Sequence, residues 1–335
     1  MNFSEWYFEW FMEYRTKDKS IETYKRYYLA YKQILAHEVG AIDLGKITNE
    51  HIQNFLNEYG ENKTKSTVKA QLSFIKSCLD DAVKQELILK NPVKSIELNY
   101  KEKYMTQLEL ASKRNEKKWL ELDEYYRLNK YLLSWLEISY QKKPFSFSKR
   151  QSKNKFFAQV QMTIILVALK TGMRYGEILG FTIHDIDFEN KIINIDKTYD
   201  YKYTFNFSKT KNISSIRTLM FDDELYEVLL KYVQWKKLHN VSTYKETLFA
   251  ELDKHYANQD INNQLKNLLT SLGIAPVSFH KLRHTHTSIL IAKGIKKEVV
   301  AKRLGHSSVG MIDKVYGHLL QSVEREETEK ILEIT

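Results

Sequence analysis

Helix-breaking residues are scarce in this chain, and that scarcity restricts the folds open to it more than any other feature. The 335 residues include only 11 glycines and 3 prolines, the residues that most often interrupt helices and form tight turns. Apolar side chains recur at helical spacing from the start. Trp6, Trp10 and Tyr14 lie four residues apart, which places them on one face of a helix. The sequence therefore predicts a mainly α-helical protein.

The first part of the chain, residues 1–95, predicts about four helices that form one compact domain. One periodic stretch has a helix-start signal at Ser20 and a helix-stop signal at Gly40. The last helix of the set is expected to run on until Asn91–Pro92 ends it. The tyrosines of this domain are predicted to pack in its core, rather than to stack on nucleic-acid bases; they are Tyr24, Tyr27, Tyr28 and Tyr31.

The rest of the chain predicts a linker, a second domain and a tail. The charged residues 96–118 show no clear periodicity and are expected to be the linker. Within the second domain, residues 119–316, the stretch 190–221 alternates and is rich in Ile, Tyr, Phe and Thr, as a small antiparallel sheet would be. The amphipathic tail, residues 317–335, is expected either to dock on a neighbouring copy or to pack on its own domain. The fold class is thus mainly α with a small antiparallel β-sheet, as a helical N-terminal domain followed by an α+β domain.

Length and cysteine usage bound the class of protein. A chain of 335 residues suggests about two domains, because single cores stop growing at roughly 250–300 residues. Cys78 is the one cysteine, so no internal disulfide can form and a reducing cytoplasm is the expected compartment. No run of about 18 apolar residues is available to span a membrane, and the N-terminal residues lack the pattern of a signal peptide. No membrane partner is therefore expected.

The charge balance is strongly basic. The net charge is +10, from 52 Lys and Arg against 42 Asp and Glu. Such a balance predicts a polyanionic partner, with nucleic acid first, although a merely soluble basic protein would share it. Residues 141–155 hold six Lys or Arg and no acidic residue, but most runs of this kind are simply solvated. The candidate DNA-binding side chains are Lys63, Lys65, Lys69 and Lys76 on N-terminal helices, Lys149 and Arg150 in the basic run, and Lys211 at a predicted hairpin.

A short stretch, SFHKLRHTHTSIL over residues 278–290, concentrates three histidines, an arginine and a lysine. On a helix, His280, Arg283 and His284 share one face, whereas His286 points elsewhere. His280 and His284 have the i, i+4 spacing of helical zinc ligands. However, Arg283 would bring a second positive charge against the metal, and no cluster of carboxylates or cysteines completes the shell. A guanidinium fork suits phosphate oxygens, so a phosphate site is favoured and no metal is expected.

Three other stretches carry candidate residues, each with an ordinary structural alternative. Arg174 is expected in the first turn of a helix, where Glu177 three residues on would suffice as its partner. Lys209 lies at a likely hairpin turn, which alone would be an ordinary basic turn. His306 follows a helix-stopping glycine, and Tyr316 comes ten residues later. A packed aromatic is the plain interpretation of any one tyrosine among 22.

Taken together, the order Arg, Lys, His-x-x-Arg, His, Tyr in the C-terminal two-thirds resembles the tyrosine recombinases, also called the phage integrase family. TGMRYGEILG is similar to the first arginine box of that family. HKLRHTHTSILIAKG followed by VVAKRLGHSSVGMIDKVYGHL is similar to the second box through to the nucleophile. The lysine before a threonine in SKTKNISSIRTL is similar to the family's hairpin lysine. The N-terminal helices resemble, more weakly, its SAM-like domain that binds core sites on DNA.

The resemblance implies an activity and its partners. The activity is site-specific cleavage and rejoining of DNA through a 3′-phosphotyrosine, without metal, ATP or other cofactor. Its task would be to integrate or excise a mobile element, namely a phage, an integrative conjugative element or a transposon. The partners are double-stranded DNA at attachment or core sites, held in a C-shaped clamp, further copies in a homo-tetramer on DNA, and an accessory DNA-bending or directionality factor. The implied catalytic residues are Arg174, Lys209, His280, Arg283, His306 and Tyr316.

The chemistry of these residue types suits the roles that the resemblance implies. Arg174 and Arg283 can hold the two non-bridging oxygens of a phosphodiester and stabilise the charge that grows in the transition state. His306 can add a third hydrogen bond. His284 and His286 are then expected to have structural roles in packing or capping.

Proton transfer completes the implied mechanism. The hydroxyl of Tyr316 has an ordinary pKa near 10, so it needs a base or a positive field to attack phosphorus. His280 is the expected proton acceptor. Lys209 is the expected general acid for the leaving 5′-hydroxyl, with Lys211 as the second candidate.

Two departures from the family pattern and three alternatives stay open at this point. Many relatives carry a further small N-terminal domain for arm-type DNA sites, whereas this chain starts almost directly with core-binding helices, as a simpler subtype or a truncated chain would. The segment SYQKKPFSFSKRQSKNKF is extra length before the helix that leads to Arg174. The alternatives are a Xer-like chromosome dimer resolvase, a type IB topoisomerase and a catalytically silent DNA-binding protein of the same fold. Tyr316 together with both arginines favours an enzyme over the silent binder.

Overall fold

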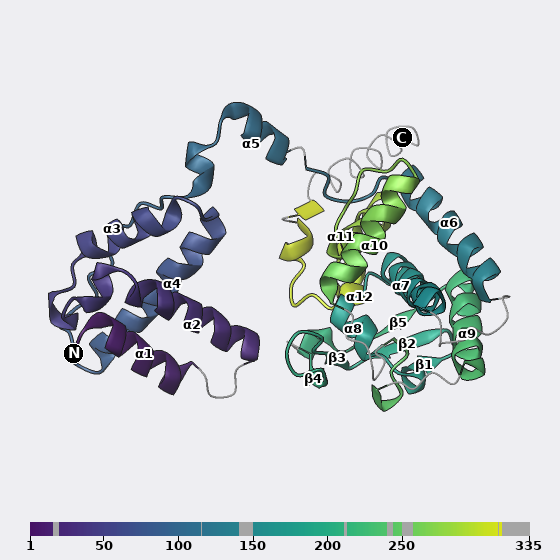
Figure 1. The fold of residues 1–335 in the computed structure, drawn as a ribbon, viewed down its shortest axis with the longest axis horizontal. Coiled ribbons are helices and arrows are strands. Elements are labelled where there is room, and N and C mark those ends of the chain that lie inside the picture. Colours follow the sequence, from purple (N-terminus) through teal and green to yellow (C-terminus); the bar gives the residue numbers. More distant parts are fainter. Residues whose placement is uncertain are drawn as a thin grey trace, which may run out of the picture. The chain divides into compact units, whose positions relative to one another are not determined.

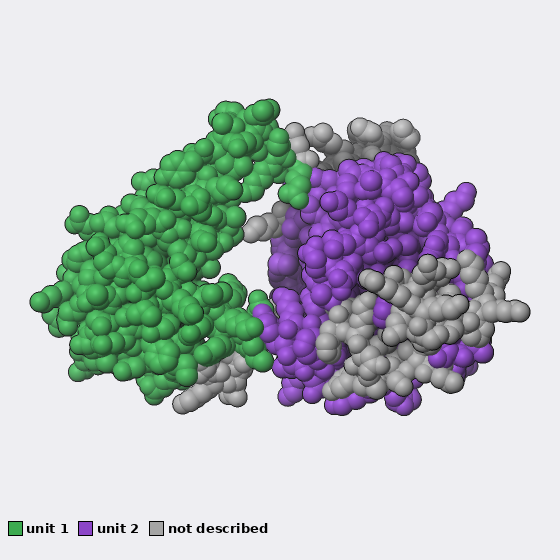
Figure 2. Space-filling view, viewed as in Figure 1, with its two compact units in different colours: residues 1–116 green, residues 117–335 purple. Residues whose placement is uncertain are grey.

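The computed structural model divides the chain into two compact units, residues 1–116 and 117–335 (Figure 2). It describes residues 1–15, 20–114, 116–140, 150–210, 213–239, 244–249, 257–313 and 315–316, with the backbone alone for residues 114, 150–155, 213 and 244. Within these residues, no helix has both the length and the apolar character needed to cross a membrane.

The first unit is a set of capped helices around an aromatic core. Side chains of Asn2, Ser20, Thr48 and Thr64 accept hydrogen bonds from first-turn N–H groups, which satisfies donors that a helix start leaves unpaired. The elements are α1 (Phe3–Tyr14), α2 (Ile21–Leu35), η1 (Glu38–Ala41), η2 (Leu44–Lys46), α3 (Asn49–Gly60), α4 (Lys65–Lys84), η3 (Lys101–Tyr104) and α5 (Gln107–Arg114) (Figure 1). The tyrosines of α2 pack against this core, as predicted; they are Tyr24, Tyr27, Tyr28 and Tyr31.

Two helix ends of the first unit differ from the sequence prediction. Helix α2 stops at Leu35 rather than Gly40, because His37 starts the new 3-10 helix η1 and its Nδ1 accepts the Val39 N–H at 3.1 Å. Helix α4 stops at Lys84, well before Asn91–Pro92. Glu86 takes a left-handed backbone conformation with φ +61°, and the N–H of Leu87 donates to the carbonyl of Ala82 at 3.0 Å. Such a turn closes a helix without glycine.

The expected linker, residues 96–118, is more ordered than predicted. Its first part packs on the core of the first unit through Ile96, Leu98 and Tyr100. The N–H of Lys101 donates to the Lys63 carbonyl at 2.9 Å, and α5 follows within the same unit. The sequence pattern did not reveal this packing, because these apolar residues follow the surface of other helices and have no period of their own.

The second unit is built round helix α7, whose residues 164–169 are all buried. Helices α6, α8, α9, α10 and α11 contact it, which explains why an apolar stretch continues through more than one face. The helices are α6 (Leu122–Tyr140), α7 (Arg150–Thr171), α8 (Tyr175–Gly180), η4 (Ile183–Asp185), η5 (Ile213–Ser215), α9 (Asp223–Leu238), η6 (Tyr244–Glu246), α10 (Asn258–Ser271), α11 (Phe279–Ala292) and α12 (Lys297–Leu304) (Figure 1).

The strands form two small antiparallel sheets, which confirms the predicted sheet. The strands are β1 (Ile186–Asp187), β2 (Ile192–Ile195), β3 (Lys197–Tyr199), β4 (Phe207–Lys209) and β5 (Arg217–Met220). One sheet has the order β1-β2-β5, and β3 pairs with β4 in the other. In β5, Arg217 and Leu219 point inward and alternate with exposed residues. A buried arginine on an inward strand position is unusual, and it lies beside the candidate site.

Candidate active site

Arg174 lies at the start of α8, directly after a sharp break in the chain. Gly172 makes that break with φ +67°, a conformation that glycine adopts readily. Arg174 is the N-cap of α8 rather than part of its first turn, which corrects the predicted position by one residue. Buried Glu177 accepts from the backbone N–H of Arg174 at 2.9 Å and from its Nη1 at 2.8 Å. The side chain remains 40% exposed, so an anion can reach a guanidinium that is already held in place.

Arg283 lies on α11 and is buried. Its Nη1 donates to the carbonyl of Gly172 at 2.8 Å, and its Nη2 donates to the carbonyl of Leu304 at 2.6 Å. Burial, and then the charge of Arg174, lower the pKa of Arg283 to about 9, so it stays cationic at neutral pH. Five N–H donors are available on a guanidinium, and these two bonds use one on each terminal nitrogen. The side chain therefore joins three chain segments and keeps donor capacity for an anion.

Tyr316 is buried, and its hydroxyl contacts the ring of His284. The distance from Oη to Nδ1 of His284 is 2.5 Å. The ring of Trp119 lies 5.7 Å from that of Tyr316 between centroids. Burial raises the pKa of Tyr316 to about 12, against the opposing effects of a hydrogen bond with Thr287 and the charge of Arg283. The hydroxyl thus stays protonated until a partner takes its proton.

The contact with His284 bears on two expectations about the histidines of α11. We expected His280 to be the proton acceptor and His284 to be structural, and in the structure it is His284 that contacts the hydroxyl. Burial, followed by the charges of His280 and Arg283, lowers the pKa of His284 to about 4, so its ring is neutral and one of its nitrogens can accept a hydrogen bond. His280 is exposed, its ring packs edge-to-face on His284 with centroids 5.4 Å apart, and desolvation followed by Arg283 and Arg174 lowers its pKa.

His286 has the structural role that we expected. Its Nδ1 lies 3.2 Å from the carbonyl of Leu169, and its Nε2 lies 3.1 Å from Nε of Arg303. Because Arg303 must donate, Nε2 accepts and Nδ1 carries the proton. Burial, followed by the charge of Arg303, lowers the pKa of His286 to about 3. The neutral ring therefore joins α7 to α12.

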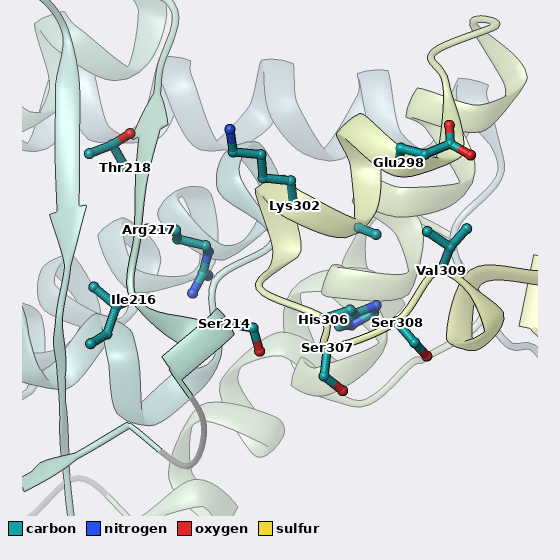
Figure 3. Close-up of a pocket in the computed structure, with 11 residues that line it drawn as sticks. Ser214, Ile216, Arg217, Thr218, Glu298, Lys302, His306, Ser307, Ser308 and Val309 are labelled. Atoms are coloured by element: carbon teal, nitrogen blue, oxygen red, sulfur yellow. The ribbon is translucent and has the colours of Figure 1, made fainter.

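His306 follows the end of α12, where Gly305 has φ +68°. This left-handed residue turns the chain, as predicted from the sequence, and a Cβ there would approach Nη1 of Arg217 to 3.0 Å. Burial, followed by the charges of Arg283 and Arg174, lowers the pKa of His306 to about 4. Its Nδ1 is buried without a hydrogen-bond partner among the described residues. His306 and Arg217 line one surface pocket of about 530 Å³ (Figure 3).

Lys209 ends strand β4, opposite Lys197, and is exposed. The predicted hairpin continues into Lys211, which lies outside the described residues. None of the hydrogen bonds among described residues joins Lys209 to Arg174, Arg283 or Tyr316. The structure therefore brings Arg174, Arg283, His284, His306 and Tyr316 together, and the role of Lys209 stays a prediction.

The candidate DNA-binding lysines of the first unit are all exposed. Lys65, Lys69 and Lys76 share one face of α4, being four and eleven residues apart. Lys63 lies just after α3, with its Nζ 5.9 Å from the centroid of the Tyr59 ring. The other candidates lie beyond what the structure describes: Lys149 and Lys211 are outside the described residues, as is the tail 317–335, and Arg150 is described by its backbone alone.

Sequence reasoning missed Arg217, which is central to the site. Its Nη1 and Nη2 donate to the two carboxylate oxygens of Glu177 at 3.2 and 2.9 Å. Both side chains are buried, at 4% and 3% exposed. The signal that would have found Arg217 is its strand alternation with Leu219, because a charged residue in phase with a core residue needs a buried partner. No group of three or more His, Cys, Asp or Glu that could bind a metal occurs among the described residues.

The chain enters the second unit along α11, beside Tyr316. Nζ of Lys281 donates to the Lys117 carbonyl at 2.7 Å. The N–H of Leu120 donates to Oγ1 of Thr285 at 2.9 Å. Trp119, between these two anchors, packs with Tyr316 in a small apolar cluster. The entry segment is thus fixed to the helix that carries Arg283 and His284.

Two protein-family models match the chain. The model of the phage integrase family matches residues 119–322, and that of the phage integrase N-terminal SAM-like domain matches residues 2–59. Because the first match covers more than half of the sequence, the chain belongs to the phage integrase family, and with it to the tyrosine recombinases.

Within that family, the chain is similar to enzymes of several mobile elements. It is 26% identical to the ICEBs1 integrase of Bacillus subtilis, over 93% of this chain and 78% of that one. It is 27% identical to the integrase of Staphylococcus phage L54a, over 86% and 80% of the two chains. It is also 25% identical to a XerC-like tyrosine recombinase of Caldanaerobacter subterraneus, over 93% and 78%.

Solved structures show the same fold. A portion of the Tn1549 transposon integrase, in complex with a circular intermediate DNA, superposes with a TM-score of 0.73 at 16% identity and covers 99% of both chains. A lambda integrase dimer bound to a core site superposes with a TM-score of 0.57 at 16% identity, over 93% of this chain and 97% of that one.

Proposed function

We propose that this protein is a site-specific DNA recombinase that cleaves and rejoins DNA through a 3′-phosphotyrosine, and that it integrates or excises a mobile element. One observation carries the proposal. The hydroxyl of buried Tyr316 contacts a neutral histidine on the helix that also supplies Arg283, and Arg283 shares its surroundings with Arg174. A nucleophile, a proton acceptor and two cations for one phosphate are thereby gathered at one place.

The chemistry follows from these groups. Arg174 and Arg283 hold the non-bridging oxygens of the scissile phosphodiester and stabilise the charge of the transition state. Oη of Tyr316 attacks phosphorus, its proton passes to a histidine of α11, and the bond to the 5′ oxygen breaks. The leaving oxygen takes a proton from Lys209. The phosphotyrosine keeps the energy of the broken ester, so a 5′-hydroxyl from a second strand reverses the step without ATP.

DNA as the substrate has independent support. The chain carries a net charge of +10, and exposed lysines follow one face of α4, as expected for phosphate contacts. The Tn1549 and lambda integrases, which share the fold, are described in complex with DNA. We extend that partner to this chain, together with assembly of a homo-tetramer on two paired core sites and an accessory DNA-bending or directionality factor.

A second candidate is resolution of chromosome dimers. It is favoured by the similarity to a XerC-like recombinase, which extends as far along the chain as that to the ICEBs1 integrase. Both tasks use the same chemistry, so the DNA sites discriminate between them. Recombination between the joined ends of a mobile element supports the integrase, whereas recombination at a chromosomal dimer site alone supports the resolvase.

The test of the proposed chemistry is a duplex that carries the joined ends of the element which encodes the protein. A nick near the cleavage position lets a short fragment leave after cleavage, and EDTA removes divalent metal. The expected result is a denaturation-resistant protein–DNA band for the native protein and none for Tyr316→Phe. Tight binding without a band for the native protein, on either class of site, would refute the catalytic proposal.

A further inference from the structure

The side chain of Arg217 forms hydrogen bonds with three separate segments around the candidate site. Besides its paired bonds to Glu177, its Nη1 donates to the carbonyl of Ser215 at 2.9 Å. Its Nε donates to the carbonyl of Arg303 at 2.7 Å. Figure 3 draws Arg217, Ser214 and His306 among the residues that line the pocket. One side chain therefore contacts η5, the carboxylate that holds Arg174 and the end of the helix that precedes His306.

Glu177 links Arg217 to Arg174, because the same carboxylate accepts hydrogen bonds from both side chains. Oε1 of Glu177 receives both Nη1 of Arg217 and Nη1 of Arg174. Burial acts to raise the pKa of Glu177, but the hydrogen bond and charge of Arg217, together with Arg174, lower it overall. The carboxylate is thus ionised between two guanidinium groups. Because Arg217 bonds both oxygens of Glu177, it restrains the oxygen that accepts from Nη1 of Arg174.

The bond from Arg217 to the carbonyl of Arg303 acts on the end of α12, directly before His306. The last carbonyls of a helix have no partner within it. At the end of α12, Arg217 takes the carbonyl of Arg303 and Arg283 takes that of Leu304. These two bonds hold the end of α12, where Gly305 turns the chain into His306.

We propose, resting on the function proposed above, that Arg217 is a positioning residue for phosphodiester cleavage: it holds Glu177 and the end of α12 so that Arg174 and His306 face the same phosphate. It does not touch the substrate, because its side chain is 4% exposed and its bonds to Glu177, Ser215 and Arg303 point inward. Arginine is required, because lysine has no planar fork to reach two oxygens of Glu177 and a carbonyl at once.

The test compares two substrates in single-turnover cleavage by the full-length protein. One is the nicked duplex described above. The other carries a methyl group in place of one non-bridging oxygen of the scissile phosphate, which removes its charge. The variants are Arg217→Lys and Arg217→Met. Arg303→Met is the matched control, because the Arg303 side chain bonds His286 and Met220 rather than Glu177 and its carbonyl remains.

The expected loss for Arg217→Lys is on the order of 10²-fold in cleavage rate on the charged substrate, as for other losses of orientation. DNA affinity stays within about twofold of the native value, since Arg217 makes no phosphate contact of its own. On the uncharged substrate the loss shrinks to a small fraction of that value, because Arg174 has less charge to hold. Arg303→Met should show the same modest effect on both substrates.

Two results overturn the proposal. One is a native cleavage rate for Arg217→Lys. The other is a loss by the same factor on both substrates, as a generally loosened fold would give. The Lys variant keeps the charge and decides the question even where Arg217→Met fails to fold. The native protein is the separate check on the proposed function, since failure to form the Tyr316-dependent band would refute that function whatever the variants do.

Discussion

The Tyr316 hydroxyl lies 2.5 Å from Nδ1 of His284, and His284 follows Arg283 directly on α11. The candidate nucleophile is therefore bonded to the residue next to the candidate phosphate clamp. A shift of α11 would move both together. In the resting site, the neutral ring of His284 forms a hydrogen bond with the hydroxyl, which keeps its proton.

Replacing His284 should slow cleavage without weakening DNA binding. His284→Ala removes the hydrogen-bond acceptor, and we expect a loss of about 10²-fold, the lower end of what a positioned proton acceptor contributes. His284→Gln restores an acceptor oxygen and should recover part of the rate. Single-turnover cleavage of the nicked duplex measures both. A native rate for His284→Ala, with a crippled His280→Ala, would return the role to His280.

The pH dependence of cleavage should carry the signature of His284. Its pKa of about 4 means that the ring remains a proton acceptor as the pH falls through 6.5. Activity that depends on this ring is lost only as the pH approaches 4. We expect the rate of the native protein to show no step near pH 6.5 from this group. A step there that disappears in His284→Gln would contradict the assignment.

Replacing Arg174 by lysine should separate cleavage from binding. Lysine keeps the charge but loses the planar fork that Glu177 orients. We expect cleavage to fall by about 10²–10³-fold, as when an oriented transition-state donor is removed. The dissociation constant for DNA should change by less than about threefold. Arg127→Lys, at an exposed arginine of α6, is the matched control, and equal losses of binding and cleavage would argue against a clamp.

Acid should destabilise the second unit through His286. Its pKa is about 3 in the folded protein and about 6.5 when unfolded, so the unfolded chain binds the extra proton between these values. Stability is therefore full above pH 6.5 and falls as the pH drops toward 3. From this group alone, the free energy of unfolding at pH 5 should be about 2 kcal/mol lower than at pH 7. Urea midpoints at both pH values measure the change, and His286→Gln should reduce the pH dependence; an unchanged dependence would contradict it.

The lysines on one face of α4 should supply salt-dependent DNA affinity. Replacing Lys65, Lys69 and Lys76 by alanine removes three candidate phosphate contacts. The slope of log affinity against log salt should become shallower by about 2–3, while the cleavage rate at saturating protein stays unchanged. Lys84→Ala is the control, because Lys84 pairs with Asp81 at 2.7 Å. An unaltered slope in the triple variant would place the DNA elsewhere.

Residue order was enough to predict the fold class and to name the residues of the candidate site. Helical spacing predicted the helix that is α11, and the glycine before His306 predicted the end of α12. Spacing did not distinguish His280 from His284, because both lie on one helix face and the choice depends on where Tyr316 returns in space. Arg217 was missed for a similar reason. Its partner Glu177 lies forty residues away in the sequence. The only sequence signal for Arg217 was therefore its inward position on a strand.

The segment that enters the second unit has a mechanical consequence. Lys117 and Leu120 are fastened to α11, and Trp119 rests on the ring of Tyr316. A displacement of the chain at residue 116 would therefore act first on α11, which carries Arg283 and His284, and on the ring of Tyr316. The connecting chain is thus attached beside Tyr316, the proposed nucleophile.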